Sequence, residues 1–365
     1  MSSPLKLYHQ FHEALKGLEK WGRPELVQTL AYLMVGIFQS QDVRLSRIAA
    51  DVPLAGQDES IAQRFRRWLK NPTVNERTIY DPVVKQLLGS LRHTRLRIQI
   101  DRTVVDGRFN VLMLSLYYRK RALPLVWQVL DHQGSSGFLD WVEVLSHLDD
   151  LLPPGACVLI LGDREFGQPD MIRTLRFYEW DFCLRVKGNY QVYSPDWGLW
   201  FALSELAPAP DKQRFFSTRY FTASERVTGV YFACACDADS DDPWFIATSL
   251  APTPRALREY ARRFACEELF SDIKARGFNL ENSQLQHPER FSRLLIAVGL
   301  LYIWVFSVAR QIRILRLDRE ITYRADEHRY SLFQLGYRWI KKRLALGNRT
   351  LPSDDFVPLR LVQEK

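Results

Sequence analysis

The spacing of apolar positions changes along the chain, and each change predicts a different kind of unit. Over residues 1–93 apolar side chains recur at intervals of three and four, as expected of amphipathic helices. The clearest of these stretches lie at residues 8–18, 24–38 and 60–69. We therefore predict a small helical domain over 1–93.

Between residues 94 and 187 the pattern changes to short runs rich in β-branched and aromatic residues. Five consecutive apolar residues at 157–161 are typical of a strand that is buried on both faces. The order strand, strand, strand, helix, strand, helix, strand predicts an α/β fold with a mixed sheet flanked by helices. These elements are expected at residues 96–100, 111–118, 123–130, 138–152, 157–161, 169–178 and 182–186.

The rest of the chain predicts a β-rich insert followed by helices. Residues 188–250 form the insert, and residues 251–320 return to helical spacing. An apolar run of 13 residues at 294–306 is shorter than a bilayer span, which needs roughly 20, so we expect a buried core helix and no membrane partner. The segment 321–365 is basic. The insert's strands are expected at 214–222, 229–235 and 244–248.

Composition narrows the possible functions. The 365 residues are 47% hydrophobic and 25% charged, which is a globular composition. A net charge of +8 favours polyanionic partners, nucleic acid before membrane surfaces. Five scattered cysteines form no CxxC pair, and the polar N-terminus shows no signal peptide, so a reduced, cytoplasmic chain is expected.

One predicted helix carries an unusual set of polar side chains. Thr253 and Pro254 suit its start, and Gly277 suits its end. At about 100° per residue, four polar residues fall within an arc of roughly 60°. They are Tyr260, Arg263, Glu267 and Lys274. A solvated face with helix-spaced salt bridges produces the same pattern, so the helix alone does not decide between the two interpretations.

The spacing of these four residues resembles a known signature. Tyr, two residues, Arg, three residues, Glu, six residues, Lys resembles the Tyr-Arg-Glu-Lys signature of bacterial insertion-sequence transposases of the insertion-sequence-four family. The resemblance implies a ribonuclease-H-like fold in which Glu267 is the third acid of an Asp-Asp-Glu metal site. It also requires two aspartates at strand ends earlier in the chain.

Asp101 and Asp163 meet that requirement, because they follow the first and fourth predicted strands. Those strands are neighbours in a ribonuclease-H-like sheet, so the two carboxylates should converge. Converging carboxylates raise each other's pKa unless a cation lies between them, and Mg²⁺ prefers such oxygen ligands. The resemblance implies two Mg²⁺ ions, with Mn²⁺ as a substitute, bound by Asp101, Asp163 and Glu267 as catalytic acids.

Two acidic residues near these positions leave alternatives open. Asp106 is an alternative to Asp101, but it lies in a turn before Gly107. Glu165, two residues after Asp163, either supports the site or lies on the surface.

Basic residues are candidate DNA contacts in two places. Lys274 lies too far along the helix to pair with Glu267, so we expect a DNA phosphate as its partner. On the helix at 60–69, Phe65 and Trp68 are expected to face the core while basic side chains on another flank meet phosphates. The candidate DNA-binding residues are Tyr260, Arg263, Lys274, Arg64, Arg67 and Lys70.

These patterns favour a DDE transposase that excises an insertion sequence and pastes it into target DNA. The implied partners are terminal inverted repeats, target DNA and a second copy of the chain in a synaptic dimer, in the bacterial cytoplasm with the nucleoid. A ribonuclease-H-like nuclease or resolvase without strand transfer remains an alternative, as does an inactive DNA-binding relative. The expected domains are 1–93 (DNA-binding), 94–187 and 251–320 (catalytic core), 188–250 (insert) and 321–365 (basic C-terminal segment).

Overall fold

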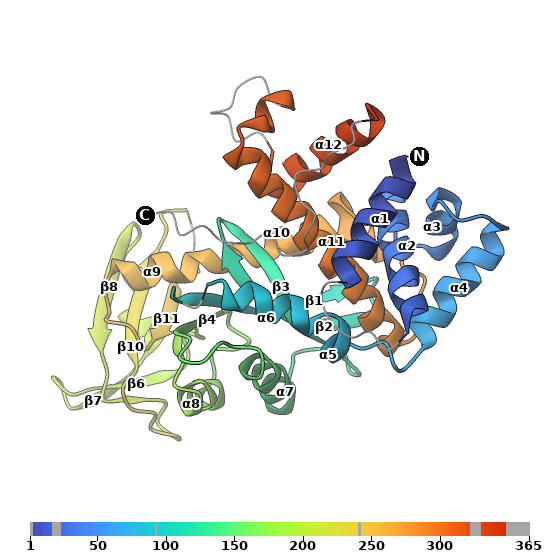
Figure 1. The fold of residues 1–365 in the computed structure, drawn as a ribbon. Helices are drawn as coiled ribbons and strands as arrows, with labels where there is room; N and C mark the ends of the chain where they lie inside the picture. Colours follow the sequence, from blue (N-terminus) through green and yellow to red (C-terminus); the bar gives the residue numbers. More distant parts are fainter. Residues whose placement is uncertain (1–2, 17–22, 92, 240–241, 322–329, 348–365) are drawn as a thin grey trace. The chain divides into compact units, whose positions relative to one another are not determined.

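The chain divides into two compact units. The structure, a computed structural model, describes residues 3–16, 23–91, 93–239, 242–321 and 330–347. One unit is mainly helical, and the other contains most of a large sheet (Figure 1). The helical unit comprises Met1–Leu91, Val104–Asn110 and Leu269–Lys365, and the sheet unit comprises Arg92–Thr103 and Val111–Glu268.

Eight strands among the described residues form one sheet in the order β3-β2-β1-β4-β5-β11-β10-β8. The predicted neighbourhood of the first and fourth strands is confirmed: residues 96–100 of β1 pair in parallel with residues 158–162 of β4. β5 is parallel to β4, whereas β11, β10 and β8 follow in antiparallel pairs, so the sheet is mixed. The strands are β1 (Leu96–Val105), β2 (Phe109–Tyr118), β3 (Arg121–Leu130), β4 (Val158–Gly162), β5 (Asp181–Arg185), β8 (Lys212–Ser217), β10 (Tyr231–Cys236) and β11 (Trp244–Thr248).

Two details differ from the sequence pattern. β1 continues five residues past its predicted end, because it forms a hairpin that turns at Asp106 and Gly107, both with positive φ. Three strands from the expected insert extend the main sheet, because β11 pairs with the open edge of β5. A second, three-stranded sheet consists of β7 (Leu199–Ala202), β6 (Gln191–Ser194) and β9 (Tyr220–Phe221).

Helices cover both faces of the large sheet. α9 lies on one face, and α7 and α8 lie on the other (Figure 1). This explains why every residue of β4 is buried, as the apolar run predicted. Leu257 and Tyr260 of α9 pack on Leu159, Leu161 and Cys183. The helices are α7 (Phe138–Asp149), α8 (Pro169–Phe177), α9 (Pro254–Ala261) and α10 (Ala265–Ser271).

The helical unit is built around α11 (Pro288–Ile314). This helix has 27 residues and is apolar enough to cross a membrane by length and composition, but 89% of its most apolar window is buried, so the predicted core helix is confirmed. Gly336 lets α12 (Leu332–Ala345) approach α11 closely, since a Cβ at Gly336 would lie 2.3 Å from the Val305 carbonyl oxygen. The other helices are α1 (Ser3–Lys16), α2 (Pro24–Ser40), α3 (Leu45–Asp51), α4 (Asp58–Lys70), α5 (Glu76–Ile79), α6 (Asp81–Gly89) and α12 (Leu332–Ala345).

Candidate active site

Alternate residues of β1 fix the position of the segment that leads to Glu267. Arg97 donates two hydrogen bonds to Glu259, at 2.6 and 2.9 Å. Two residues further along the strand, the fully buried Gln99 donates to the backbone oxygen of Arg262 at 2.5 Å. Alternate strand residues lie on one face of a sheet, so these contacts set α9 in register with β1.

The next residue on that face is Asp101, and its partner is Arg263. The guanidinium donates to Asp101 Oδ2 at 3.0 Å and to Glu267 Oε1 at 2.7 Å. Arg263 is 8% exposed, whereas Glu267 is largely exposed. A single arginine therefore connects two of the three predicted acids. The pairing with Glu267 follows from the helical spacing, but the contact with Asp101 was not predicted.

The helical segment is not the single uniform α-helix that the predicted polar stripe assumed. α9 ends at Ala261, and Arg262–Phe264 form a 3₁₀ turn before α10. A 3₁₀-helix has three residues per turn, fewer than an α-helix. Side chains before and after the 3₁₀ turn therefore point in different relative directions than they would along one α-helix. Tyr260 is 1% exposed and packs edge-on against Trp244.

Lys274 has partners within the protein, so the expectation that its charge needs a DNA phosphate as partner is wrong. It lies in a π-helical turn, Asp272–Arg276, that follows α10. Its ammonium group donates to the Val104 carbonyl oxygen at 2.5 Å and lies 3.3 Å from Glu281. Val104 is 170 residues away in sequence, and Glu281 lies seven residues on, beyond the predicted helix end at Gly277, so helical spacing alone gave no sign of either partner.

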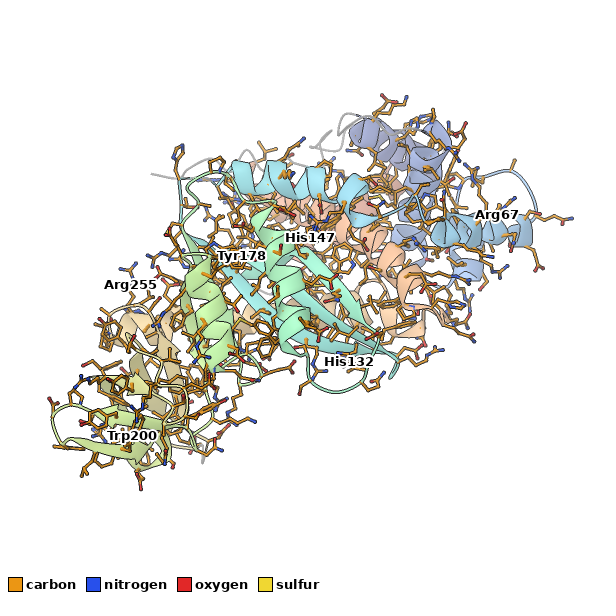
Figure 2. All side chains as sticks on the ribbon, turned by 90° about the horizontal axis from the view of Figure 1, so that it is seen from below. Arg67, His132, His147, Tyr178, Trp200 and Arg255 are labelled. Atoms are coloured by element: carbon orange, nitrogen blue, oxygen red, sulfur yellow. The ribbon has the colours of Figure 1, made fainter. Side chains whose placement is uncertain are left out.

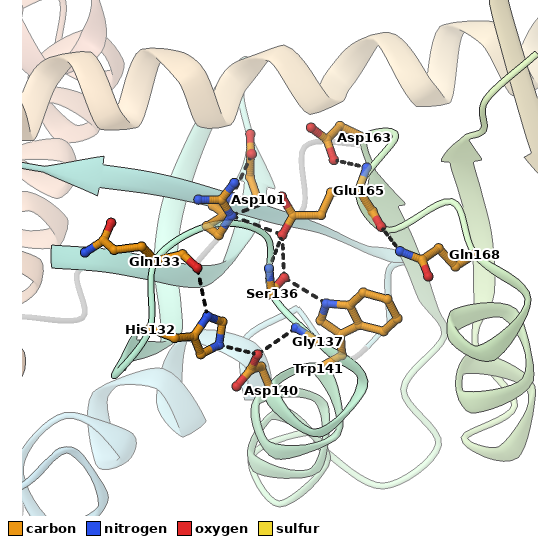
Figure 3. Close-up of polar contacts among 11 residues, drawn as sticks. Asp101, His132, Gln133, Ser136, Gly137, Asp140, Trp141, Asp163, Glu165 and Gln168 are labelled. Atoms are coloured by element: carbon orange, nitrogen blue, oxygen red, sulfur yellow. Dashed lines mark hydrogen bonds and ion pairs between the residues drawn. The ribbon is translucent and has the colours of Figure 1, made fainter. Parts of the chain in front are cut away.

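The turn after β4 holds Asp163 through Glu165. The backbone N–H of Glu165 donates to Asp163 Oδ1 at 2.9 Å, while its carboxylate accepts from Arg102 at 3.0 Å and from the Ser136 N–H at 2.8 Å. Trp141 donates in turn to the Ser136 hydroxyl at 2.8 Å (Figure 3). Of the two interpretations left open for Glu165, this network supports the one in which it orders the site.

Burial and charge act together on Asp101. Burial raises the pKa of Asp101 to about 6; the Arg263 guanidinium opposes this shift, and the carboxylates of Asp163 and Glu267 add to it. In the ranges described, no three His, Cys, Asp or Glu side chains are gathered closely enough to hold a metal ion. The donor set nevertheless suits a hard divalent cation, because it consists of carboxylates whose mutual repulsion such an ion relieves.

Comparison with known proteins adds an independent finding. The family model described as the transposase DDE domain matches residues 108–304, more than half of the chain. The chain belongs to this family. The search of curated proteins found no match to this chain. The matched range includes Asp163 and Glu267 and begins after Asp101, so DDE transposase membership is independent of the assignment of Asp101.

A DDE transposase acts on DNA, and the structure separates the predicted contacts on α4 into two groups. Arg64 donates to Thr29 Oγ1 at 3.0 Å and lies over the Tyr32 ring, so its guanidinium group already has contacts within the protein. Arg67 and Lys70 are exposed (Figure 2 labels Arg67).

Proposed function

We propose that this transposase cuts DNA at the ends of an insertion sequence and joins those ends to target DNA. Asp101, Asp163 and Glu267 are the catalytic acids in this proposal. The observation that carries it is the adjacency of Asp101 and Asp163 just beyond the paired segments of β1 and β4, with Arg263 connecting Asp101 to Glu267. The Tyr-Arg-Glu-Lys spacing supports placement in the insertion-sequence-four group.

The three carboxylates would hold two Mg²⁺ ions, for which Mn²⁺ can substitute. When bound, such ions activate water or a DNA 3′-hydroxyl and stabilise the leaving oxygen. The protein contributes the fixed positions of the acids. Arg97 and Gln99 hold the helical segment in register with β1, and Glu165 orders the turn that carries Asp163.

The DNA contacts proposed here differ in how directly they act. Arg67 and Lys70 are exposed and available to phosphates. Arg263, Lys274 and Arg64 already have partners within the protein, and a phosphate would share or replace those partners. Tyr260 acts through packing, because it lies in the core beside the turn that carries Arg263.

The proposed substrates are the terminal inverted repeats and target DNA, brought together by a synaptic homodimer in the bacterial cytoplasm. The test is incubation of the purified chain with Mg²⁺, duplexes that end in the element's own repeat, and a supercoiled target. Cleaved ends joined to the target support the proposal. Cleavage without joining would identify a nuclease or resolvase instead, and binding alone would identify an inactive DNA-binding relative.

A further inference from the structure

A basic pocket lies in the helical unit, and none of the three proposed catalytic acids lines it. Its volume is about 280 Å³, and it is lined by Arg66 of α4, Ser46 of α3, and His287 and Arg290 at the start of α11. One water occupies roughly 30 Å³ of liquid, so the pocket has room for a phosphate group and several waters.

The charges around this pocket lack an acidic counterpart in its lining. None of the nine described residues that line it is Asp or Glu. Arg66 donates to a neutral oxygen, Gln63 Oε1, at 3.3 Å. Glu289, which is outside the lining, lies 3.9 Å from His287. Two arginines that share a concave site repel each other, and an anion between them removes that repulsion.

The position of Arg290 also favours an anion in the pocket. It lies in the first turn of a 27-residue helix, where the helix dipole is positive and a cation is unfavourable. The helix dipole and the two guanidinium groups therefore both favour an anionic ligand. Arginine forks match the oxygens of a phosphate group, and the hydroxyl of Ser46 adds a further donor.

We propose that this pocket binds a backbone phosphate of duplex DNA. The inference takes DNA as the substrate, as the proposed function does, but requires none of its chemistry. It names Arg66 and Arg290 as phosphate contacts that the sequence pattern missed, because they are remote in the chain and meet only in the folded unit.

The test measures duplex affinity against salt concentration for the full chain without divalent ions. Arg66→Gln and Arg290→Gln should each weaken binding by about threefold to tenfold and lower the salt slope by about 1. Arg47→Gln is the matched control, since Arg47 is exposed on the neighbouring α3 and does not line the pocket. Its slope should not change. Arg66→Lys and Arg290→Lys, which keep the charge, should keep the slope and show that the site tolerates substitution.

Three outcomes would overturn the inference. The first is an unchanged slope for folded Arg66→Gln and Arg290→Gln proteins. The second is an equal loss in Arg47→Gln, which would indicate general surface attraction. The third is tight binding of inorganic phosphate that stabilises the parent protein at constant ionic strength without competing with DNA, which would assign the pocket to free phosphate. Because no cleavage is measured, this result does not depend on whether the catalytic proposal is correct. Failure of the phosphate-binding proposal would likewise leave the catalytic proposal standing.

Discussion

Arg263 and Asp101 are 162 residues apart in sequence, yet the guanidinium lies 3.0 Å from the carboxylate in a site almost closed to solvent. A buried carboxylate is costly unless a positive charge or hydrogen bonds compensate it. The contact depends on Gln99, which holds the backbone of the preceding residue, Arg262. It joins the acid on β1 to the helical turn that precedes Glu267.

Replacement of Arg263 by Ala should destabilise the protein. The variant leaves Asp101 buried without its cation, and loss of one partner of a buried pair costs roughly 3–5 kcal/mol. Urea denaturation measures the change. Asp101→Asn in the Arg263→Ala background should recover part of the loss, because the uncompensated charge is gone. Strictly additive losses in the double variant would argue against a coupled pair.

Replacement of Glu165 by Ala should also cost stability, by about 1–3 kcal/mol, because the Ser136 N–H and the Arg102 guanidinium lose their acceptor. Glu143→Ala is a suitable control, since Glu143 is exposed and accepts a hydrogen bond from the side chain of Gln128. Equal losses in the two variants would show that the Glu165 network adds nothing specific.

Glu259 should give a distinct dependence of stability on pH. Burial raises the pKa of Glu259, but hydrogen bonds from Arg97 and Arg262 outweigh this effect and lower the pKa from 4.5 to about 2. A carboxyl whose pKa is lower in the folded state stabilises the fold above the unfolded value, and this contribution is lost as the pH falls towards the folded value.

Glu259→Gln should therefore lower the free energy of unfolding at neutral pH by up to about 3 kcal/mol. The difference from the parent protein should shrink below about pH 4.5 and be smallest near pH 2, where Glu259 is itself neutral. Denaturation curves recorded from about pH 7 to about pH 3 test this. A difference that stays constant across that range would rule out the assigned ion pairs as its source.

Arg67 and Lys70 should contribute to DNA affinity without dependence on sequence. Each alanine variant should lower the salt slope by about 1 and weaken binding to different duplexes alike. Lys85→Ala, an exposed change on α6, should leave the slope as it is. Salt slopes equal to the parent's in both Arg67→Ala and Lys70→Ala would show that this flank of α4 is an ordinary solvated surface without a role in DNA binding.

The sequence pattern was sufficient where local burial determines structure. β4 was predictable because an unbroken apolar run is stable only when both faces of the strand are covered, as α9, α7 and α8 cover it. Phe65 and Trp68 of α4 are buried as their helical spacing predicted. The parallel pairing of β1 and β4 followed from the order of elements together with the family resemblance.

The remaining features depend on contacts that no local pattern contains. The 3₁₀ turn at Arg262–Phe264 forms where Gln99 donates a hydrogen bond to the Arg262 carbonyl oxygen. The helix type of this turn therefore depends on a tertiary contact. Lys274 donates to the carbonyl oxygen of Val104, 170 residues away, and pairs with Glu281 beyond the predicted end of its helix, and neither contact follows from helical spacing. The edge of β5 likewise accepts β11, although the spacing of those strands suggested a separate insert.

Catalysis by the three acids is tested by comparing cleavage and binding of the element's own end duplex by the parent protein and by Asp101→Asn, Asp163→Asn and Glu267→Gln. With Mg²⁺ present, we expect the parent to cut at the repeat end, and each variant to lose cutting by at least about 10²-fold, since each loses a carboxylate that would hold the ions. End binding without Mg²⁺ should remain within about threefold of the parent for each folded variant, because no phosphate contact is removed. Cutting at the parental rate by any one of the three folded variants would contradict the assignment of that residue as a catalytic acid.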